Sequence, residues 1–250
     1  MSERPTAVLI HGLSETRHVW RRQTSFLEQY FRVISYDVRG FGKSPTGNAD
    51  GTVRQFADDL AQLLSAFDTG PVWLVGFSMG GVISQRFALD FPSQTKGMIL
   101  IASSCTVGTH GQKFFNYRIK QVEKGGLRNI AETNSNDARG CFFTKDEKLI
   151  EEYKKLRVTA VQDPAGYLNA CHAMLNVGAN PLTPELNAIG CPASIIAGEH
   201  DPYCPPKASK MIADAIPNAN LSVIENVGHC MQFEASDQLN DQISSFITDH

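Results

Sequence analysis

Three features that would point to other classes of protein are absent from this sequence. No apolar run approaches the roughly 18 residues of a membrane span. The opening stretch, MSERPTAVLIHG, has no basic segment followed by a long apolar one, as a secretory leader would. No run of lysine and arginine forms a basic stripe, and the formal net charge is −3. We therefore expect no secretory leader, no membrane partner and no nucleic-acid partner.

Cysteine is sparse and scattered. The six cysteines contain no C-x-x-C pair, which is unlike a zinc site or the framework of a small disulfide-rich domain. This usage is typical of a reduced, cytoplasmic compartment. We expect no metal, no cofactor and a cytoplasmic protein.

What is present is an alternation of short apolar runs and amphipathic stretches along 250 residues. The runs are continuous rather than alternating, as in strands buried on both faces of a parallel sheet. They cover residues 6–10, 32–37, 72–77, 97–103, 193–198 and 221–226. Helices are predicted at about 18–30, 53–67, 79–91, 206–215 and 234–248. This order predicts an α/β fold with a doubly wound, mostly parallel sheet.

One segment interrupts the alternation. Residues 107–188 contain no convincing strand and several charged amphipathic stretches, broken among other places at Gly125-Gly126. Asp163 before Pro164 is typical of a helix N-cap with proline at the first helical position. We expect residues 107–188 to form a helical cap, with residues 1–106 and 189–250 making up the α/β core.

A serine lies where a predicted strand meets a predicted helix. Gly76-Phe77-Ser78-Met79-Gly80 is a G-x-S-x-G pattern, and between a strand and a helix it predicts a nucleophile elbow. The helix that follows directs its N-terminal N–H groups at the same place, where they favour negative charge. The pattern alone also fits a glycine- and serine-rich loop, so its position in the chain carries the inference. We predict that Ser78 is a nucleophile.

A serine nucleophile needs a base and a group that orients the base. The last two predicted strands run into EHDPYCPP and VGHCMQFE, which puts Asp201 and His229 beyond their carboxyl ends. The order serine, acid, histidine along the chain is the order expected for this arrangement. Glu199 is a rival for the acid. We predict Ser78, Asp201 and His229 as a catalytic triad.

A tetrahedral intermediate also needs donors for its oxyanion. The backbone N–H of Met79, directly after the nucleophile, is the expected first donor. The second is expected from the loop LIHGLSETRHVW (9–20), where Gly12 permits a tight bend and Leu13 supplies the N–H. His11 is then expected to brace this loop rather than to take part in catalysis.

The blocks HGL, DVRGFGKS (37–44), GFSMGG (76–81), GEHDPYCPP (198–206) and GHCMQFE (228–234) resemble the α/β-hydrolase family, in its order and spacing. Within it, VISYDVRGFGKS and DPAGYLNACHAM (163–174) are most similar to 3-oxoadipate enol-lactonases and related carboxylesterases. The family usually has two strands before the HG loop, whereas ten residues precede His11 here, so we expect the first strands to be trimmed. Enol-lactonases tend to show Arg-Trp-Phe-Thr in the cap, where this chain has Cys-Phe-Phe-Thr (141–144) with Arg139 upstream.

The resemblance and the three residues imply a serine hydrolase that acts on a small ester or lactone, with no cofactor. Two alternatives use the same scaffold: a small-ligand sensor without turnover, and a C–C bond hydrolase or perhydrolase. We expect a small-molecule partner and leave a homodimer open. Residues expected to shape the substrate pocket are Gly12, Phe142, Phe143 and His172.

Overall fold

A six-stranded parallel sheet forms the centre of the molecule. The computed structural model describes residues 4–250. Its strands are β1 (Thr6–Ile10), β2 (Arg32–Ser35), β3 (Val72–Phe77), β4 (Thr95–Ile101), β5 (Ala193–Gly198) and β6 (Ala219–Ile224). They lie in the order β2-β1-β3-β4-β5-β6, and each neighbouring pair is parallel. All six predicted strands form, and the α/β fold class is confirmed.

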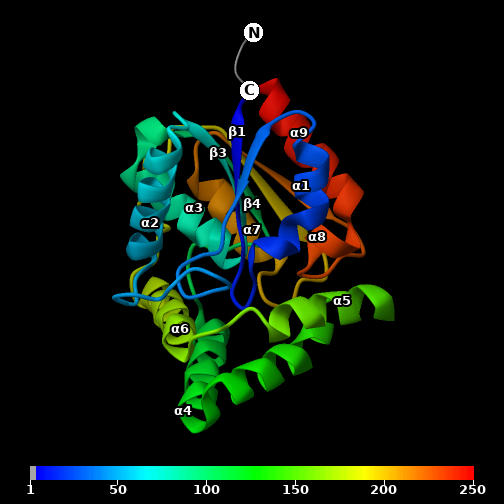
Figure 1. Ribbon diagram of the computed structural model, residues 1–250. Coiled ribbons are helices and arrows are strands. Elements are labelled where there is room, and N and C mark those ends of the chain that lie inside the picture. The colour runs from blue at the N-terminus through cyan, green and yellow to red at the C-terminus, as the bar shows by residue number, and fades with distance from the viewer. Residues whose placement is uncertain (1–3) are drawn as a thin grey trace.

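Helices cover both faces of this sheet (Figure 1). Alternate residues of the central strands face opposite layers: Val8 and Leu74 pack with α2 and α3, whereas Leu9 and Val75 pack with α1 and α9. The helices of the core are α1 (Arg21–Leu27), α2 (Val53–Phe67), α3 (Met79–Asp90), α7 (Pro206–Ala215), α8 (Met231–Glu234) and α9 (Ser236–Asp249). Short 3₁₀ helices span Arg17–Trp20, Pro92–Gln94, Arg139–Cys141 and Leu186–Ala188.

Two predicted helices are divided in the structure. The helix predicted at 18–30 is a 3₁₀ turn followed by α1, and the one predicted at 234–248 is α8 and α9. α8 and α9 are separated by Ala235, whose φ of −129° and ψ of 42° are not helical. Strand order reverses beside β1, because the chain moves to β2 on one side and to β3 on the other. In open α/β sheets, ligands bind at such a point, outside the carboxyl ends of the strands.

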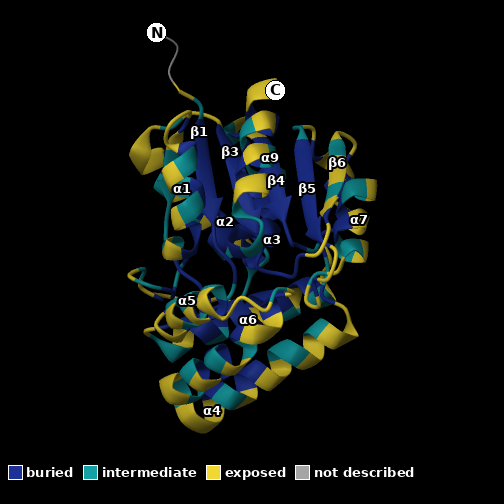
Figure 2. Cartoon of the chain, turned by 90° about the vertical axis from the view of Figure 1, so that its right-hand side faces the viewer, coloured by how far each residue is buried: buried dark blue, intermediate teal, exposed yellow. Residues whose placement is uncertain are grey.

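The segment between β4 and β5 is helical and lies across the carboxyl ends of the strands (Figures 1 and 2). It contains α4 (Thr109–Ala138), α5 (Glu147–Val158) and α6 (Pro164–Ala179). α6 begins as expected, with the Asp163 carboxylate accepting the N–H of Ala165 at 2.9 Å. The predicted break at Gly125-Gly126 is a kink inside α4, where Gly126 has a φ of 54°.

The loop after β2 fastens this helical segment to the core. The N–H of Gly42 donates to the carbonyl of Ala160 at 2.8 Å. Gly40 meets the start of α6 backbone to backbone, since a Cβ on Gly40 would lie 2.4 Å from the Cα of Gly166. Gly40 also has a φ of 81°, which side chains disfavour. Glycine is therefore required at this contact for two reasons.

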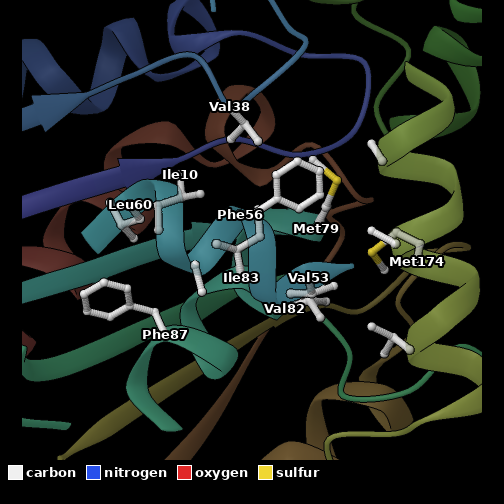
Figure 3. Close-up of a cluster of buried hydrophobic side chains, with 14 of the residues drawn as sticks. Ile10, Val38, Val53, Phe56, Leu60, Met79, Val82, Ile83, Phe87 and Met174 are labelled. Carbon is white, nitrogen blue, oxygen red and sulfur yellow. The ribbon is translucent and has the colours of Figure 1, made fainter. Parts of the chain in front are cut away.

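Apolar packing continues from the core into the helical segment. Met79, at the start of α3, and Met174, on α6, belong to one buried cluster with Ile10, Phe56 and Val82 (Figure 3). The segment and the sheet thus share a core. Within residues 4–250, no helix is long and apolar enough to cross a bilayer.

Candidate active site

Ser78 stands on a strained turn between β3 and α3. Its φ of 53° and ψ of −117° lie in a region that non-glycine residues seldom occupy. The turn is tight: a Cβ on Gly76 would lie 2.4 Å from the carbonyl oxygen of Gly80, and one on Gly80 would lie 2.1 Å from that of Ile10. Strain of this kind persists where the surroundings enforce it, commonly at functional sites. The two glycines of the G-x-S-x-G pattern are therefore steric requirements of the turn.

The end of β4 and the residues that follow it hold the turn in place. The N–H of Ser78 donates to the carbonyl of Ile101 at 2.9 Å. The Ser103 hydroxyl donates to the carbonyl of Ser78, also at 2.9 Å. Ser103 is fully buried, and no sequence pattern distinguishes it from an ordinary loop serine. Both the N–H and the carbonyl of Ser78 are thus held by hydrogen bonds from the end of the neighbouring strand.

Asp201 and His229 are hydrogen-bonded to each other. Nδ1 of His229 lies 2.7 Å from Oδ2 of Asp201, and both residues are buried. The other carboxylate oxygen, Oδ1, accepts the backbone N–H groups of Tyr203 at 2.8 Å and Cys204 at 3.0 Å. This arrangement fixes the carboxylate and places the His229 proton on Nδ1. Nε2 is left as the basic nitrogen.

The electrostatics of His229 follow from two opposing effects. Burial is the largest single effect and lowers the pKa of His229. The charge of Asp201 and its hydrogen bond act in the opposite direction, with smaller effects from Cys141 and Glu15, and the net result is a pKa raised above its ordinary value. The ring is therefore suited to accept a proton and hold it beside a carboxylate.

Glu199, the rival acid, is used elsewhere. Its side chain is exposed, and Oε2 accepts the N–H of Asn226 at 3.0 Å. Asn226 has a φ of 56°, so this bond supports a tight turn after β6. Between the two acids, Asp201 is the one bonded to His229.

His11 holds its own loop. Its Nε2 accepts the N–H of Val38 at 2.9 Å, and Nδ1 therefore carries the proton and donates to the carbonyl of Gly12 at 2.8 Å. The ring is fully buried, and burial lowers its pKa to about 4. The bracing role expected for His11 agrees with these bonds.

A cavity of about 500 Å³ lies between the sheet edge and the helical segment. Its lining includes Ser78 and His229, together with Leu13 and Met79, whose backbone N–H groups are the predicted oxyanion donors. A substrate held in this cavity would meet all four residues. Within the described part of the chain, no group of three or more His, Cys, Asp or Glu side chains is arranged to hold a metal ion.

The four residues predicted to shape the pocket do not line this cavity. Gly12 is buried and gives its N–H to the Glu15 carboxylate at 2.9 Å. Phe142 is buried against Tyr153 and Phe233, as part of the packing under α5.

The other two lie on the surface. Phe143 is 46% exposed and stacks on the ring of His200, with centroids 4.0 Å apart. His172 is exposed on α6, beside Gly51. Arg139 is also directed elsewhere and pairs with Glu147 at 2.5 Å.

A buried polar network, which no sequence motif indicates, reaches the cavity. Glu15 accepts the N–H of Gly12 on one carboxylate oxygen and the Tyr153 hydroxyl on the other, at 2.7 Å. The guanidinium of Arg157 donates to the Tyr153 oxygen at 3.0 Å. Burial raises the pKa of Glu15, and these contacts act in the opposite direction. The network connects α5 to the loop that carries Leu13.

All six cysteines are free thiols, and Cys141 is one of the residues that line the cavity. Its carbonyl accepts the backbone N–H groups of His229 at 2.8 Å and Cys230 at 3.0 Å. The neighbouring Cys230 side chain lowers the pKa of Cys141 to about 6, although burial acts against it. The backbone of Cys141 thus helps to place the loop of His229.

A parallel sheet, helices on both faces, a serine on a strand–helix turn and a helical segment over the strand ends together define the α/β-hydrolase class. The chain belongs to the alpha/beta hydrolase fold family, whose sequence profile matches residues 5–236.

Similar proteins cover nearly the whole chain. A protein named "Putative carbamate hydrolase RutD", from Agrobacterium fabrum, is 25% identical over 98% of this chain and 94% of its own length. 3-Oxoadipate enol-lactonase 2 of Acinetobacter baylyi is 26% identical over 98% and 89%. A solved structure of a thermophilic esterase from Thermogutta terrifontis superposes with a TM-score of 0.85, at 27% identity over 99% and 90%.

Proposed function

We propose that the protein is a serine hydrolase that cleaves a small carboxylic ester or lactone through an acyl-enzyme intermediate. The observation that carries this proposal is the His229–Asp201 pair at 2.7 Å, which lies at the same cavity as Ser78. Membership of the α/β-hydrolase family supports a hydrolase. The enol-lactonase and esterase among the similar proteins support an ester or lactone as the substrate class.

In the proposed first step, the Ser78 hydroxyl attacks the substrate carbonyl while Nε2 of His229 takes its proton. His229 then gives that proton to the leaving alcohol, and the acyl group remains on Ser78. In the second step His229 takes a proton from the water that attacks the acyl carbonyl, and it then gives this proton to the oxygen of Ser78 as the acyl–Ser78 bond breaks and the acid is released. Asp201 keeps the ring in one tautomer and stabilises the imidazolium in both steps.

The backbone N–H groups of Met79 and Leu13 are the proposed oxyanion donors. Met79 opens α3, and the first N–H groups of a helix have no partner within the helix. Leu13 follows Gly12, whose own N–H is held by Glu15. This chemistry needs neither a metal nor a cofactor.

The test is the turnover of 4-nitrophenyl acetate. The wild type should show a burst of 4-nitrophenol and should be labelled covalently by a fluorophosphonate probe. Ser78→Ala should lose the burst and the label and lower kcat by roughly three or more powers of ten. The matched control is Ser104→Ala, which removes a hydroxyl from the lining of the same cavity.

A wild type that binds small esters without turnover would indicate a ligand sensor and contradict the proposal. Turnover of Ser78→Ala at the wild-type rate would contradict it as well. Loss of turnover in both Ser78→Ala and Ser104→Ala would mean that the loss cannot be assigned specifically to Ser78, which contradicts the proposal.

A further inference from the structure

Arg118 is a buried cation in the cavity wall. It lies on α4 and is 1% exposed, yet it is one of the residues that line the cavity of Ser78. A guanidinium has five N–H donors and no acceptor. Burying it is unfavourable unless those donors are met. The neighbours of Arg118 therefore indicate what it can bind.

The protein supplies partners for only some of the N–H donors of Arg118. Nη2 of Arg118 pairs with the carboxylate of Asp137. Nε and Nη1 have no hydrogen-bond acceptor anywhere in residues 4–250. The guanidinium carbon lies over the ring of Phe114, 4.9 Å from its centroid, which is within the range of a cation–π contact. Two buried nitrogens thus remain to bind a ligand in the cavity.

An aromatic wall connects Arg118 to the base. The ring of Phe114 packs against that of Tyr203, with centroids 5.9 Å apart, and Tyr203 packs against the His229 ring at 5.2 Å. All four residues line the cavity. A substrate with its scissile carbonyl at Ser78 can therefore extend along this wall and place its far end at Arg118.

The other charged side chains near the cavity are less suited than Arg118 to bind the far end of a substrate. Arg157 donates to the Tyr153 hydroxyl and to the carbonyl of Asn134. Both oxygens of Glu15 accept hydrogen bonds from the protein. Lys207 is exposed where it borders the cavity and adds positive charge.

We propose that Arg118 binds a carboxylate of the substrate, and that the preferred substrates are esters or lactones bearing a second, ionised carboxyl group away from the scissile bond. A carboxylate matches the planar fork of a guanidinium, and charge-assisted bonds of this kind are among the strongest. Asp137 already neutralises part of the charge, so the bond is directional rather than a general attraction for anions. This inference rests on the proposed hydrolase function and names its substrate class.

The experiment compares esters that differ only in one charge. Mono-4-nitrophenyl esters of dicarboxylic acids from glutarate to suberate are compared with their neutral methyl esters, with Ser78→Ala as the blank for spontaneous hydrolysis. A second arm puts the carboxylate in the leaving group, as in 4-butyryloxybenzoate against its methyl ester. The wild type should favour the charged ester in one arm by about ten- to a hundredfold in kcat/KM. The arm that shows it identifies which half of the substrate carries the carboxylate.

Arg118→Met should bring that preference, the ratio of kcat/KM for the charged ester to kcat/KM for its neutral methyl ester, to about one. Arg118→Met combined with Asp137→Asn removes the pair together, so that no carboxylate is left without its partner. Arg128→Met, an exposed arginine on the same helix, is the matched control and should keep the preference.

Three results separate this inference from the proposed function. A wild type that hydrolyses the neutral esters at least as well as the charged ones in both arms overturns the inference, whatever the variants do. So does a charge preference that persists in folded Arg118 variants. Absence of any Ser78-dependent turnover overturns the proposed function itself.

Discussion

His11 and His229 are two buried histidines at the same edge of the sheet, but their surroundings shift their pKa values in opposite directions. His11 is bonded to main-chain groups, and burial lowers its pKa to about 4. His229 is bonded to the carboxylate of Asp201, which outweighs burial and raises its pKa. A carboxylate in direct contact thus distinguishes a ring that can take up a proton from one that stays neutral.

The same contrast separates the loops that carry them. The loop after β1 is fixed by hydrogen bonds to backbone groups, as at His11 and Gly12. The loops after β5 and β6 are joined by the hydrogen bond between Nδ1 of His229 and the carboxylate of Asp201. The first loop is suited to hold backbone donors still, and the second pair is suited to move protons. The following predictions test this division.

The largest effect is expected from replacing the two histidines in turn. His229→Ala should lower kcat by roughly three or more powers of ten, because the base is lost. His11→Gln should keep kcat within about tenfold, because His11 acts only through its loop. Turnover of 4-nitrophenyl acetate by variants with native circular dichroism measures both. Equal losses would abolish the distinction between the two sites.

Asp201→Asn should remove the negative charge that makes the pKa of His229 higher than that of His11. We expect kcat to fall by roughly two to four powers of ten, since the amide no longer stabilises the imidazolium. Wild-type activity should rise with pH through a midpoint above the ordinary imidazole value of about 6.5, because only the neutral ring is a base. In the variant burial is opposed only by the smaller effects of Cys141 and Glu15, so the midpoint should move to lower pH.

Glu199→Gln is the control for this change, and its rate and pH midpoint should match those of the wild type. The measurement is kcat/KM against pH with an ester for which chemistry is rate-limiting. A midpoint that does not move in Asp201→Asn would show that the carboxylate does not set the pKa of His229.

The positions of Ser78, Asp201 and His229 could be predicted from the sequence for a physical reason. Strands buried on both faces leave continuous apolar runs, and the carboxyl ends of parallel strands meet at one edge. A tight turn at Ser78 requires small residues on both sides, so it leaves a local pattern. Asp201 and His229 follow from their positions after the last two strands. Each of these inferences depends on neighbours in the chain.

The lining of the cavity could not be predicted in this way. Phe142 and Phe143 are adjacent, but one is buried under α5 and the other stacks on His200, which only tertiary packing decides. Arg118 on a charged amphipathic helix has the pattern of a solvated residue. Glu15 resembles an ordinary loop acid. Their roles depend on contacts between segments far apart in the chain.

Tyr153→Phe tests whether the cap segment, residues 107–188, helps to hold the loop after β1. The variant loses the hydrogen bond to Glu15, and with it one of the two contacts that hold this carboxylate near Gly12. We expect kcat to fall by about two- to tenfold with little change in KM. Tyr117→Phe, at an exposed tyrosine on α4, should have no effect. A change in KM alone would place Tyr153 in substrate binding instead.

The smallest expected effect concerns stability and follows from the low pKa of His11. The unfolded chain takes up a proton near pH 6.5, whereas the native ring does so only near pH 4. Stability should therefore fall as pH falls between these values. His229, whose pKa is raised, contributes with the opposite sign: its stability is present below the unfolded pKa and is lost as pH rises through the folded one.

Urea unfolding between pH 4 and pH 8 measures this dependence. The free energy of unfolding of His11→Gln should lack the decrease on the acid side. That of His229→Gln should keep this acid-side decrease and should lack the loss of stability that the wild type shows as pH rises above about 6.5. An unchanged acid slope in His11→Gln would mean that the ring does not titrate as its burial implies.

The contact between Gly40 and Gly166 limits how this enzyme could be rebuilt. Exchanging caps between family members is an attractive route to new specificities, because the cap is one continuous insertion. At this joint, however, a Cβ on either glycine would lie 2.4 Å from the Cα of the other. A transplanted cap would have to carry a glycine at the same turn of its last long helix, or it would lie displaced from Ser78. The modularity of the fold is therefore conditional on one backbone contact outside the cavity.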